Sequence, residues 1–202
     1  MLEGVWVCTF PVFQSLSLFS VGIVGVGGLL LGGGLSFLSA QEGLAADTIV
    51  GWETVLANGS VVNIDAASQP DLAKAMRGSG SQFGIVTQYT MDVHPIDKVW
   101  GGSCPYDDTQ SDKLYAALHN FVTDGQKDPK AAIIFTDLLL PLGISTKLIY
   151  YFYDGPTPPT SGAFADFFKI PGLLCVPRTQ KYSELVRPQT IHQHNTLLTP
   201  IS

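Results

Sequence analysis

The sequence predicts an α+β chain, in which antiparallel strands are combined with short helices. Three observations lead to this class. A hairpin signal lies within residues 48–64, helix-forming stretches lie at 69–77 and 109–124, and two further strand-like runs start at Ala131 and Ser145.

The predicted hairpin is the clearest element. The run "TIVGWETVLA" is rich in strand-forming residues, with Ile49 and Val55 at positions that favour burial. Asn58-Gly59 follows it, which is typical of a two-residue hairpin turn, and "SVVNID" supplies the return strand.

A short helix is predicted over residues 69–77. Pro70 suits the first helical position, Asp71 suits the positive end of the helix, and Lys74 and Arg77 suit its last turn. The helix leads into the glycine-rich loop "GSGSQFG" at 78–84, and the alternating run "IVTQYTMDV" that follows predicts a strand stopped by Pro95.

The second half of the chain is predicted to hold an amphipathic helix and an antiparallel sheet. Leu114, Leu118 and Phe121 have helical spacing within 109–124 and are expected in the core. "AAIIFTDLLLPL" and "STKLIYYFYDG" predict two paired strands, and a short helix is expected at 162–169. Tyrosines 150, 151 and 153 of the second strand are possible bases in principle, but no motif assigns them a role, so the catalytic residue stays unknown.

Composition excludes several classes of protein. Only 14% of the 202 residues are charged and the formal net charge is −6, which argues against nucleic acid as a partner. The cysteines Cys8, Cys104 and Cys175 are odd in number and widely spaced, which argues against both a disulfide framework and a zinc site. His192 and His194 lack a third ligand at a recognised spacing, so no metal site is expected.

The N-terminal residues 1–23 are apolar and unassigned. The stretch 16–31 is apolar enough to suggest a membrane span, but the only early charge is Glu3, whereas a signal peptide requires a positive start. Seven glycines among residues 22–34 would cost a helix roughly 7 kcal/mol, so this tract is predicted to be irregular backbone. A soluble, intracellular protein is therefore expected, and a membrane-anchored protein is the weaker alternative.

Two nucleotide-binding motifs fail in the glycine tract. The dinucleotide fingerprint can be laid on Gly25 and Gly27, but Leu30 occupies its last position, and no Gly-Lys-Ser/Thr sequence supports a phosphate loop of the Walker type. A doubly wound nucleotide fold is therefore disfavoured.

A series of blocks nevertheless resembles a known family. "VGVGG" at 24–28, "GGG" at 32–34, "EGLAADTIVGWETVLANGSVV" and "DLAKAMRGSGSQFGIVT" occur in the order seen in PCMH-type FAD-linked oxidoreductases of the vanillyl-alcohol-oxidase and berberine-bridge-enzyme-like group, many of them fungal. The resemblance implies that 24–95 is the second half of an FAD-binding domain with an antiparallel sheet and helices. A weaker likeness implies that 96–185 is part of an antiparallel-sheet substrate domain, followed by a tail at 186–202.

The resemblance also implies a cofactor site made of bare main chain. Glycines let backbone N–H groups approach a flavin and its pyrophosphate without an intervening Cβ atom. The residues implied to contact FAD are Gly27, Gly28, Gly32, Gly33, Gly34, Asp47, Gly84, Ile85 and Val86. Two alternatives stay open: the glycines could be tight packing turns, and Asp47 could hold its own loop through main-chain hydrogen bonds.

The sequence departs from the family in ways that limit the expected function. No glycine-histidine loop precedes Val24, and Val21 stands where some relatives carry a flavin-linked cysteine, so no covalent link to FAD is expected. The chain looks truncated. The resemblance implies FAD-linked oxidation of a small organic molecule, with O2 as a candidate oxidant of the flavin, in fungal secondary metabolism. The alternative is a non-catalytic remnant or interaction fragment of such an enzyme.

Overall fold

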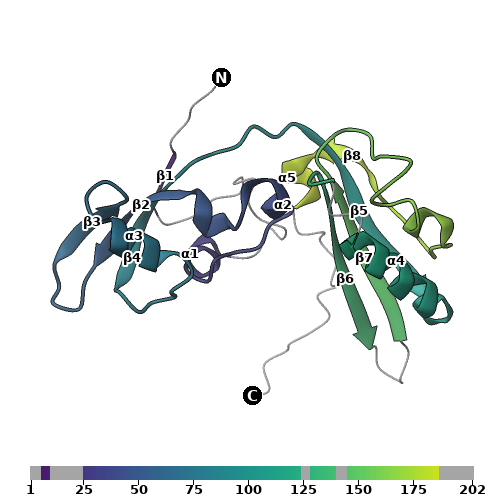
Figure 1. The fold of residues 1–202 in the computed structure, drawn as a ribbon, viewed down its shortest axis with the longest axis horizontal. Coiled ribbons are helices and arrows are strands. Elements are labelled where there is room, and N and C mark those ends of the chain that lie inside the picture. Colours follow the sequence, from purple (N-terminus) through teal and green to yellow (C-terminus); the bar gives the residue numbers. More distant parts are fainter. Residues whose placement is uncertain (1–5, 10–24, 124–127, 140–144, 187–202) are drawn as a thin grey trace, which may run out of the picture.

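The structure is a computed structural model that describes residues 6–9, 25–123, 128–139 and 145–186. It contains two four-stranded antiparallel sheets, one in each half of the chain, connected by the segment between Met91 and Lys98 (Figure 1). The predicted α+β class is confirmed. The predicted features at Val21, His192 and His194 lie outside the described residues.

The first sheet has the strand order β1-β4-β2-β3. Its strands are β1 (Trp6–Thr9), β2 (Ile49–Val55), β3 (Val61–Asp65) and β4 (Ile85–Met91). The short helices that accompany it are α1 (Val26–Leu31), α2 (Ser39–Glu42) and α3 (Pro70–Met76), with a 3-10 turn η1 (Ala45–Thr48). The predicted helix at 69–77 and the strand after it are therefore confirmed.

The predicted hairpin is present, but its turn is one residue longer than expected. The N–H of Leu56 donates to the carbonyl of Ser60 at 2.9 Å, so Ala57, Asn58 and Gly59 form the loop. Gly59 has a φ of 81°, and the side chain of Asn58 accepts a hydrogen bond from the N–H of Ser60 at 3.0 Å. This side-chain contact stabilises the three-residue loop in place of a two-residue turn.

The glycine tract is less irregular than the sequence predicts. Residues Val26–Leu31 form α1, and Leu30 is only 1% exposed because it packs in the core of the first sheet. Tertiary packing of these leucines offsets the poor helix propensity of the glycines. The irregular part is confined to the end of the helix, where Gly33 and Gly34 have φ values of 96° and 76°. Within the described residues, no helix is both long and apolar enough to cross a bilayer.

The second sheet has the strand order β6-β7-β5-β8. Its strands are β5 (Lys98–Asp107), β6 (Ala131–Leu139), β7 (Ser145–Tyr153) and β8 (Arg178–Lys181). It is accompanied by α4 (Ser111–Thr123), α5 (Tyr182–Leu185) and two 3-10 turns, η2 (Asp108–Gln110) and η5 (Phe167–Lys169).

The predicted amphipathic helix and the two paired strands of this half are confirmed. Leu114 of α4 is fully buried, and Leu118 and Phe121 are partly buried against the same cluster of side chains. The helix expected at 162–169 is wrong in extent, because only Phe167–Lys169 are helical and the preceding residues form turns.

Strand β5 is central in this sheet although it contains Pro105. The proline is tolerated because β8 pairs only with the first four residues of β5, so Pro105 lies beyond the end of β8, while β7 pairs with β5 from Trp100 to Asp107. On the side of β5 beyond the end of β8, the carbonyl of Pro105 accepts a hydrogen bond from the N–H of Leu173 at 2.9 Å. A neighbouring bond joins the N–H of Val176 to the carbonyl of Ser103 at 3.0 Å, so the segment 172–176 covers this edge.

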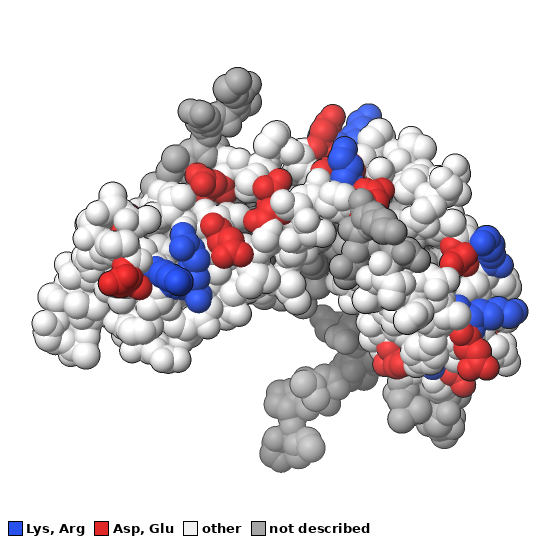
Figure 2. Space-filling view, in the orientation of Figure 1, with Lys and Arg blue, Asp and Glu red and all other residues white. Residues whose placement is uncertain are grey.

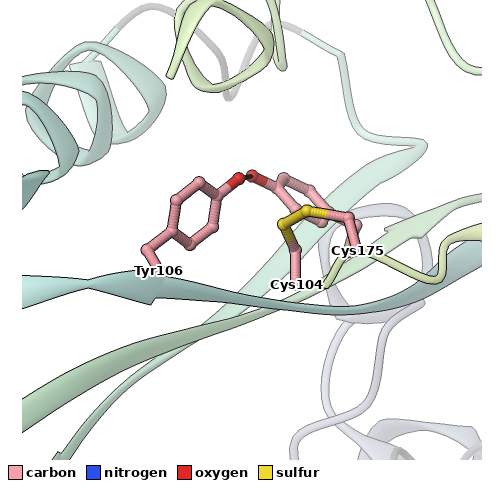
Figure 3. The surroundings of a disulfide bond; sticks show 4 residues. Cys104, Tyr106 and Cys175 are labelled. Carbon is pink, nitrogen blue, oxygen red and sulfur yellow. Dashed lines mark hydrogen bonds between the residues drawn. A yellow bond between two sulfur atoms is a disulfide. The ribbon is translucent and has the colours of Figure 1, made fainter. Parts of the chain in front are cut away.

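A disulfide between Cys104 and Cys175 fixes the same segment to β5 (Figure 3). The bond corrects the expectation that the cysteines are unpaired, since it joins residues 71 positions apart that only the folded sheet brings together. Cys104 is 1% exposed, and a Cβ atom at Gly172 would collide with both sulfur atoms. Glycine is therefore required where the segment passes over the disulfide.

The two halves of the chain meet through a small aromatic core. Phe37, which precedes α2, stacks on Phe152 of the second sheet with ring centroids 4.8 Å apart. Leu38 and Tyr182 belong to the same buried cluster. A residue from the first half thus forms part of the core of the second.

Candidate functional site

The predicted FAD-contacting glycines lie where three segments of the first half converge. These segments, 25–34, 43–48 and 78–84, are called the glycine wall below. The N–H groups of Ala45 and Ala46 donate to the carbonyls of Gly34 and Gly33, both at 2.8 Å, and the N–H of Gly80 donates to the carbonyl of Leu31 at 2.9 Å. The sequence-distant glycine loops are therefore joined by main-chain hydrogen bonds.

Gly33 and Gly78, from two different segments of the wall, lie next to each other. A Cβ atom placed on Gly78 would lie 4.0 Å from both the nitrogen and the Cα atom of Gly33. Both residues have positive φ values, 96° and 75°, which L-residues with side chains rarely adopt. The backbone conformation therefore favours glycine at both positions, whereas a Cβ atom on Gly78 would make only an ordinary contact with Gly33.

Part of the wall faces open space. Among the described residues, and apart from the adjoining backbone, no atom would lie within 4 Å of a Cβ atom at Gly28 or at Gly80, and Gly28 is exposed on α1. Bare main chain beside open space is what a flat ligand needs in order to lie against a backbone. These residues fit one side of an FAD site.

Other predicted glycines are explained by the protein's own packing. A Cβ atom at Gly34 would lie 2.9 Å from the Cβ atom of Ala45, and one at Gly84 would lie 2.5 Å from the carbonyl oxygen of Val55. At these two positions, neighbouring residues of the first half already occupy the space that glycine leaves.

The second predicted stretch, Gly84 to Val86, begins β4. Ile85 pairs with Val55 across the sheet and is 71% exposed, whereas Val86 packs against the buried core that contains Leu30 of α1. The two predicted stretches therefore share one hydrophobic core.

Tyr89 links α1 to β4. Its hydroxyl donates to the carbonyl of Gly27 at 3.3 Å. Burial raises the pKa of Tyr89 to about 12, so the hydroxyl stays protonated and can donate at neutral pH. This bond holds Gly27 against the sheet.

Asp47 holds its own loop. Its Oδ2 atom accepts a hydrogen bond from the N–H of Leu44 at 2.9 Å, and the side chain is exposed. A Cβ atom at Gly43 would lie 2.9 Å from the same oxygen, so the turn is closed tightly around the carboxylate. This hydrogen bond therefore supports the alternative that Asp47 stabilises its own loop.

The tyrosines of β7 are engaged in the fold. The hydroxyls of Tyr151 and Tyr106 lie 2.7 Å apart in a buried hydrogen bond (Figure 3), and burial raises the pKa of both groups. The hydroxyl of Tyr150 donates to the carbonyl of Leu185 at 3.0 Å, and burial raises its pKa as well. Because the raised pKa values keep these hydroxyls protonated and each already has a hydrogen-bond partner, they are poor candidates for a catalytic base.

A charged cluster at the end of the second sheet is engaged in the same way. The Nζ atom of Lys147 lies 2.7 Å from Asp108 and 3.0 Å from Asp137, and the hydroxyl of Tyr115 donates to Asp137 at 2.6 Å. Hydrogen bonds to the two carboxylates raise the pKa of Lys147. Lys147 lowers the pKa of Asp108, and Tyr115 followed by Lys147 lowers that of Asp137. The cluster ties η2 and α4 to the strands.

Neither the charged side chains nor the possible metal ligands of the described residues indicate a further binding site. Among the described residues, no three His, Cys, Asp or Glu side chains lie close enough together to hold a metal ion. On the face shown in Figure 2, Lys and Arg are few and lie beside Asp and Glu. A hollow of about 300 Å³ lies on the first sheet, and its lining contains none of the predicted FAD residues. It is lined by Val50, Gly51, Trp52, Glu53, Asn63, Ile64, Asp65, Gln88 and Thr90.

Comparisons with known proteins agree with the resemblance seen in the sequence. No protein-family model matches the chain. An FAD-linked oxidoreductase from Arthroderma benhamiae is 42% identical over 167 residues, which are 82% of this chain and 33% of that protein. The bifunctional solanapyrone synthase of Alternaria solani is 40% identical over 106 residues, which are 52% of this chain and 21% of that protein.

A solved structure supports the fold. The BBE-like 1 protein of Physcomitrella patens matches with a TM-score of 0.68 and 25% identity, over 83% of this chain and 36% of that one. The chain thus spans about a third of the length of the relatives that it matches. Over that third, its sequence is similar to that of a fungal FAD-linked oxidoreductase, and its fold is similar to that of the corresponding part of a BBE-like protein.

Proposed function

We propose that this chain supplies one wall of an FAD site in an oxidoreductase that acts on a small organic molecule, as a step in fungal secondary metabolism. The observation that carries the proposal is the side-by-side run of Gly33 and Gly78, next to the open main chain at Gly28. The fungal relatives support FAD as the ligand.

The proposed contacts are mainly through the backbone. Gly27, Gly28, Gly32 and Gly33 would present main-chain atoms to the flavin and its pyrophosphate. Gly34 would act by letting the turn pack on Ala45, and Asp47 by holding its loop closed. Gly84, Ile85 and Val86 would meet the adenosine end of FAD at the start of β4.

FAD held at the glycine wall would supply a hydride acceptor for the oxidation of a carbon atom of the substrate, with O2 as the proposed final electron acceptor. The protein would bind, orient and shield the reactants. We propose that FAD is held without a covalent link and that the second sheet forms part of the substrate-binding half.

The alternative function is that of a non-catalytic fragment. The chain spans about a third of its relatives, so contacts that the rest of those proteins provide would be missing from it. On this alternative, the glycine wall is a preserved piece of fold without enough contacts to retain FAD.

The two functions are separated by adding FAD to the purified 202-residue chain. Binding would be followed by flavin absorbance after gel filtration and by quenching of tryptophan fluorescence, since Trp52 lies in the core beside the wall. Near-equimolar, saturable FAD supports the proposal, and a well-folded, colourless protein supports the fragment. Acid precipitation then tests the absence of a covalent link, because yellow colour should remain in the supernatant.

A further inference from the structure

Arg77 lies beside the glycine wall, between helix α3 and the 78–84 loop. It follows the last residue of α3 and directly precedes Gly78. Its guanidinium carbon lies 5.6 Å from the ring centre of Trp52, within the range of a cation–π contact, and its Nη2 atom donates to the carbonyl of Ile49 at 3.1 Å. The sequence assigned this residue only to the charged end of a helix.

These contacts connect separate parts of the wall. Ile49 follows the η1 turn, and Ala46 in that turn donates its N–H to the carbonyl of Gly33. Gly78, on the other side of Arg77, lies next to Gly33. The side chain of Arg77 therefore holds the start of the 78–84 loop against β2, the strand that follows the 43–48 segment of the wall.

The environment of Arg77 is not explained by stability alone. Its Nε atom is buried and has no hydrogen-bond partner among the described residues. A buried donor without an acceptor destabilises a fold, and an apolar side chain of similar length could cover Trp52 without that penalty. A role in fixing the position of the 78–84 loop, through the contacts of Arg77 with Ile49 and Trp52, explains better why an arginine stands at this position.

Charge gives a second reason for an arginine. Lys74 and Arg77 are the only Lys or Arg residues within 24–95, the region implied to bind FAD. Lys74 is exposed on α3, whereas Arg77 is partly buried next to the wall. The pyrophosphate of FAD is anionic, so a fixed guanidinium near the wall favours its binding.

We infer that Arg77 is a positioning residue of the FAD site, which holds the 78–84 loop beside Gly33 through its contacts with Trp52 and Ile49. This inference rests on the proposed function and adds to it a side chain that acts through the loop. Without Arg77, the 78–84 loop is held less firmly against the 25–34 segment of the wall and FAD binds more weakly, although the fold persists.

The test compares Arg77→Met and Arg77→Lys with the control Lys74→Met in the 202-residue chain. The control removes one positive charge three residues earlier, within α3. Hydrogen exchange measures the amide of Gly80, which is bonded to Leu31 and reports the loop's attachment without any ligand. In Arg77→Met this amide should exchange about tenfold faster, whereas Lys74→Met should match the unaltered chain.

The second readout is FAD affinity, with thermal unfolding of the flavin-free protein alongside. Arg77→Met should raise the Kd for FAD about tenfold and shift the Tm by no more than about 2 °C. The Kd of Arg77→Lys should lie between those of the unaltered chain and Arg77→Met. Lysine keeps the positive charge but lacks the planar guanidinium that lies over the ring of Trp52.

The outcomes separate this inference from the proposed function. Unchanged exchange at Gly80 in Arg77→Met refutes the positioning role, whether or not FAD binds. A large fall in Tm would make Arg77 a structural residue and would also refute it. If the unaltered chain binds no FAD but exchange at Gly80 rises in Arg77→Met, the proposed function fails while the attachment of the loop by Arg77 stands.

Discussion

The exposed glycine of α1 offers a direct way to separate stability from cofactor binding. Gly28 lies inside Val26–Leu31, and a Cβ atom there would meet no atom of the described residues within 4 Å outside the helix's own backbone. The substitution Gly28→Ala therefore adds a methyl group to open space without disturbing any packed neighbour. It also places that group on the surface where FAD is proposed to lie.

Gly28→Ala should stabilise the flavin-free protein but weaken the binding of FAD. Alanine is favoured over glycine in a helix by about 1 kcal/mol, so the flavin-free protein should become more stable, with a rise in Tm of roughly 2–4 °C for a chain of this size. The methyl group would hold FAD away from the main chain and lengthen a hydrogen bond to its phosphate oxygens. Loss of one such charge-assisted bond, about 1.5–3 kcal/mol, corresponds to a Kd raised by roughly 10- to 100-fold.

The measurement needs thermal or urea unfolding of the flavin-free protein and an FAD titration of the same preparation. Gly84→Ala is the matched comparison, because Gly84 has a φ of 148° and its Cβ atom would lie 2.5 Å from the carbonyl oxygen of Val55. That substitution should destabilise the protein by at least about 2 kcal/mol.

Two results would refute the reasoning about Gly28. If Gly28→Ala binds FAD as tightly as the unaltered chain, the cofactor does not lie against α1. If Gly28→Ala lowers the Tm, the space above Gly28 is not open in the folded protein.

Three further predictions concern the second sheet. Replacing both Cys104 and Cys175 by alanine should lower the free energy of unfolding by up to about 4 kcal/mol, given the 71-residue separation, and urea unfolding without reductant measures it; an unchanged midpoint would show that the bond adds no stability. Tyr106→Phe should cost about 1–2 kcal/mol by leaving the hydroxyl of Tyr151 unpaired, and most of that loss should return in the double variant with Tyr151→Phe, so additive losses would contradict a direct hydrogen bond. Because the pKa values of Asp108 and Asp137 are lowered in the folded state, their contribution is present above about pH 3.8 and is lost as the pH falls through the lowered values. In Lys147→Met the urea midpoint should therefore depend less on pH between 2 and 5, and an equally steep dependence would contradict this linkage.

Local patterns predicted the elements whose signals lie within a few residues. The hairpin, α3, β4, α4 and the pair β6–β7 all follow from turn chemistry, capping residues or periodicity. Strand β5 did not follow, because Gly101, Gly102 and Pro105 break its pattern. The structure explains the glycines: a Cβ atom at Gly101 would collide with the carbonyl of Tyr151, and one at Gly102 would lie 2.9 Å from that of Val176.

The candidate site was predictable only in part, for the same physical reason. Glycine motifs indicated which backbone is bare, but not which glycines face open space, as at Gly28, and which face the protein, as at Gly84. The contacts of Arg77 with Trp52 and Ile49 join residues 25 and more positions apart, and no local pattern encodes them. Helix α1 forms despite its glycines because burial of its leucines in the core of the first sheet stabilises it.

The Cys104–Cys175 bond means that the structure is that of the oxidised chain. Such bonds form and persist in the secretory pathway and outside the cell, whereas the reducing cytosol keeps most thiols free. In a reducing compartment, or in a buffer with dithiothreitol, the segment 172–176 would rely on its two backbone hydrogen bonds to β5 alone. The intracellular location expected from the sequence stays a prediction, and the redox poise where the protein folds decides whether this edge of the second sheet is covalently closed.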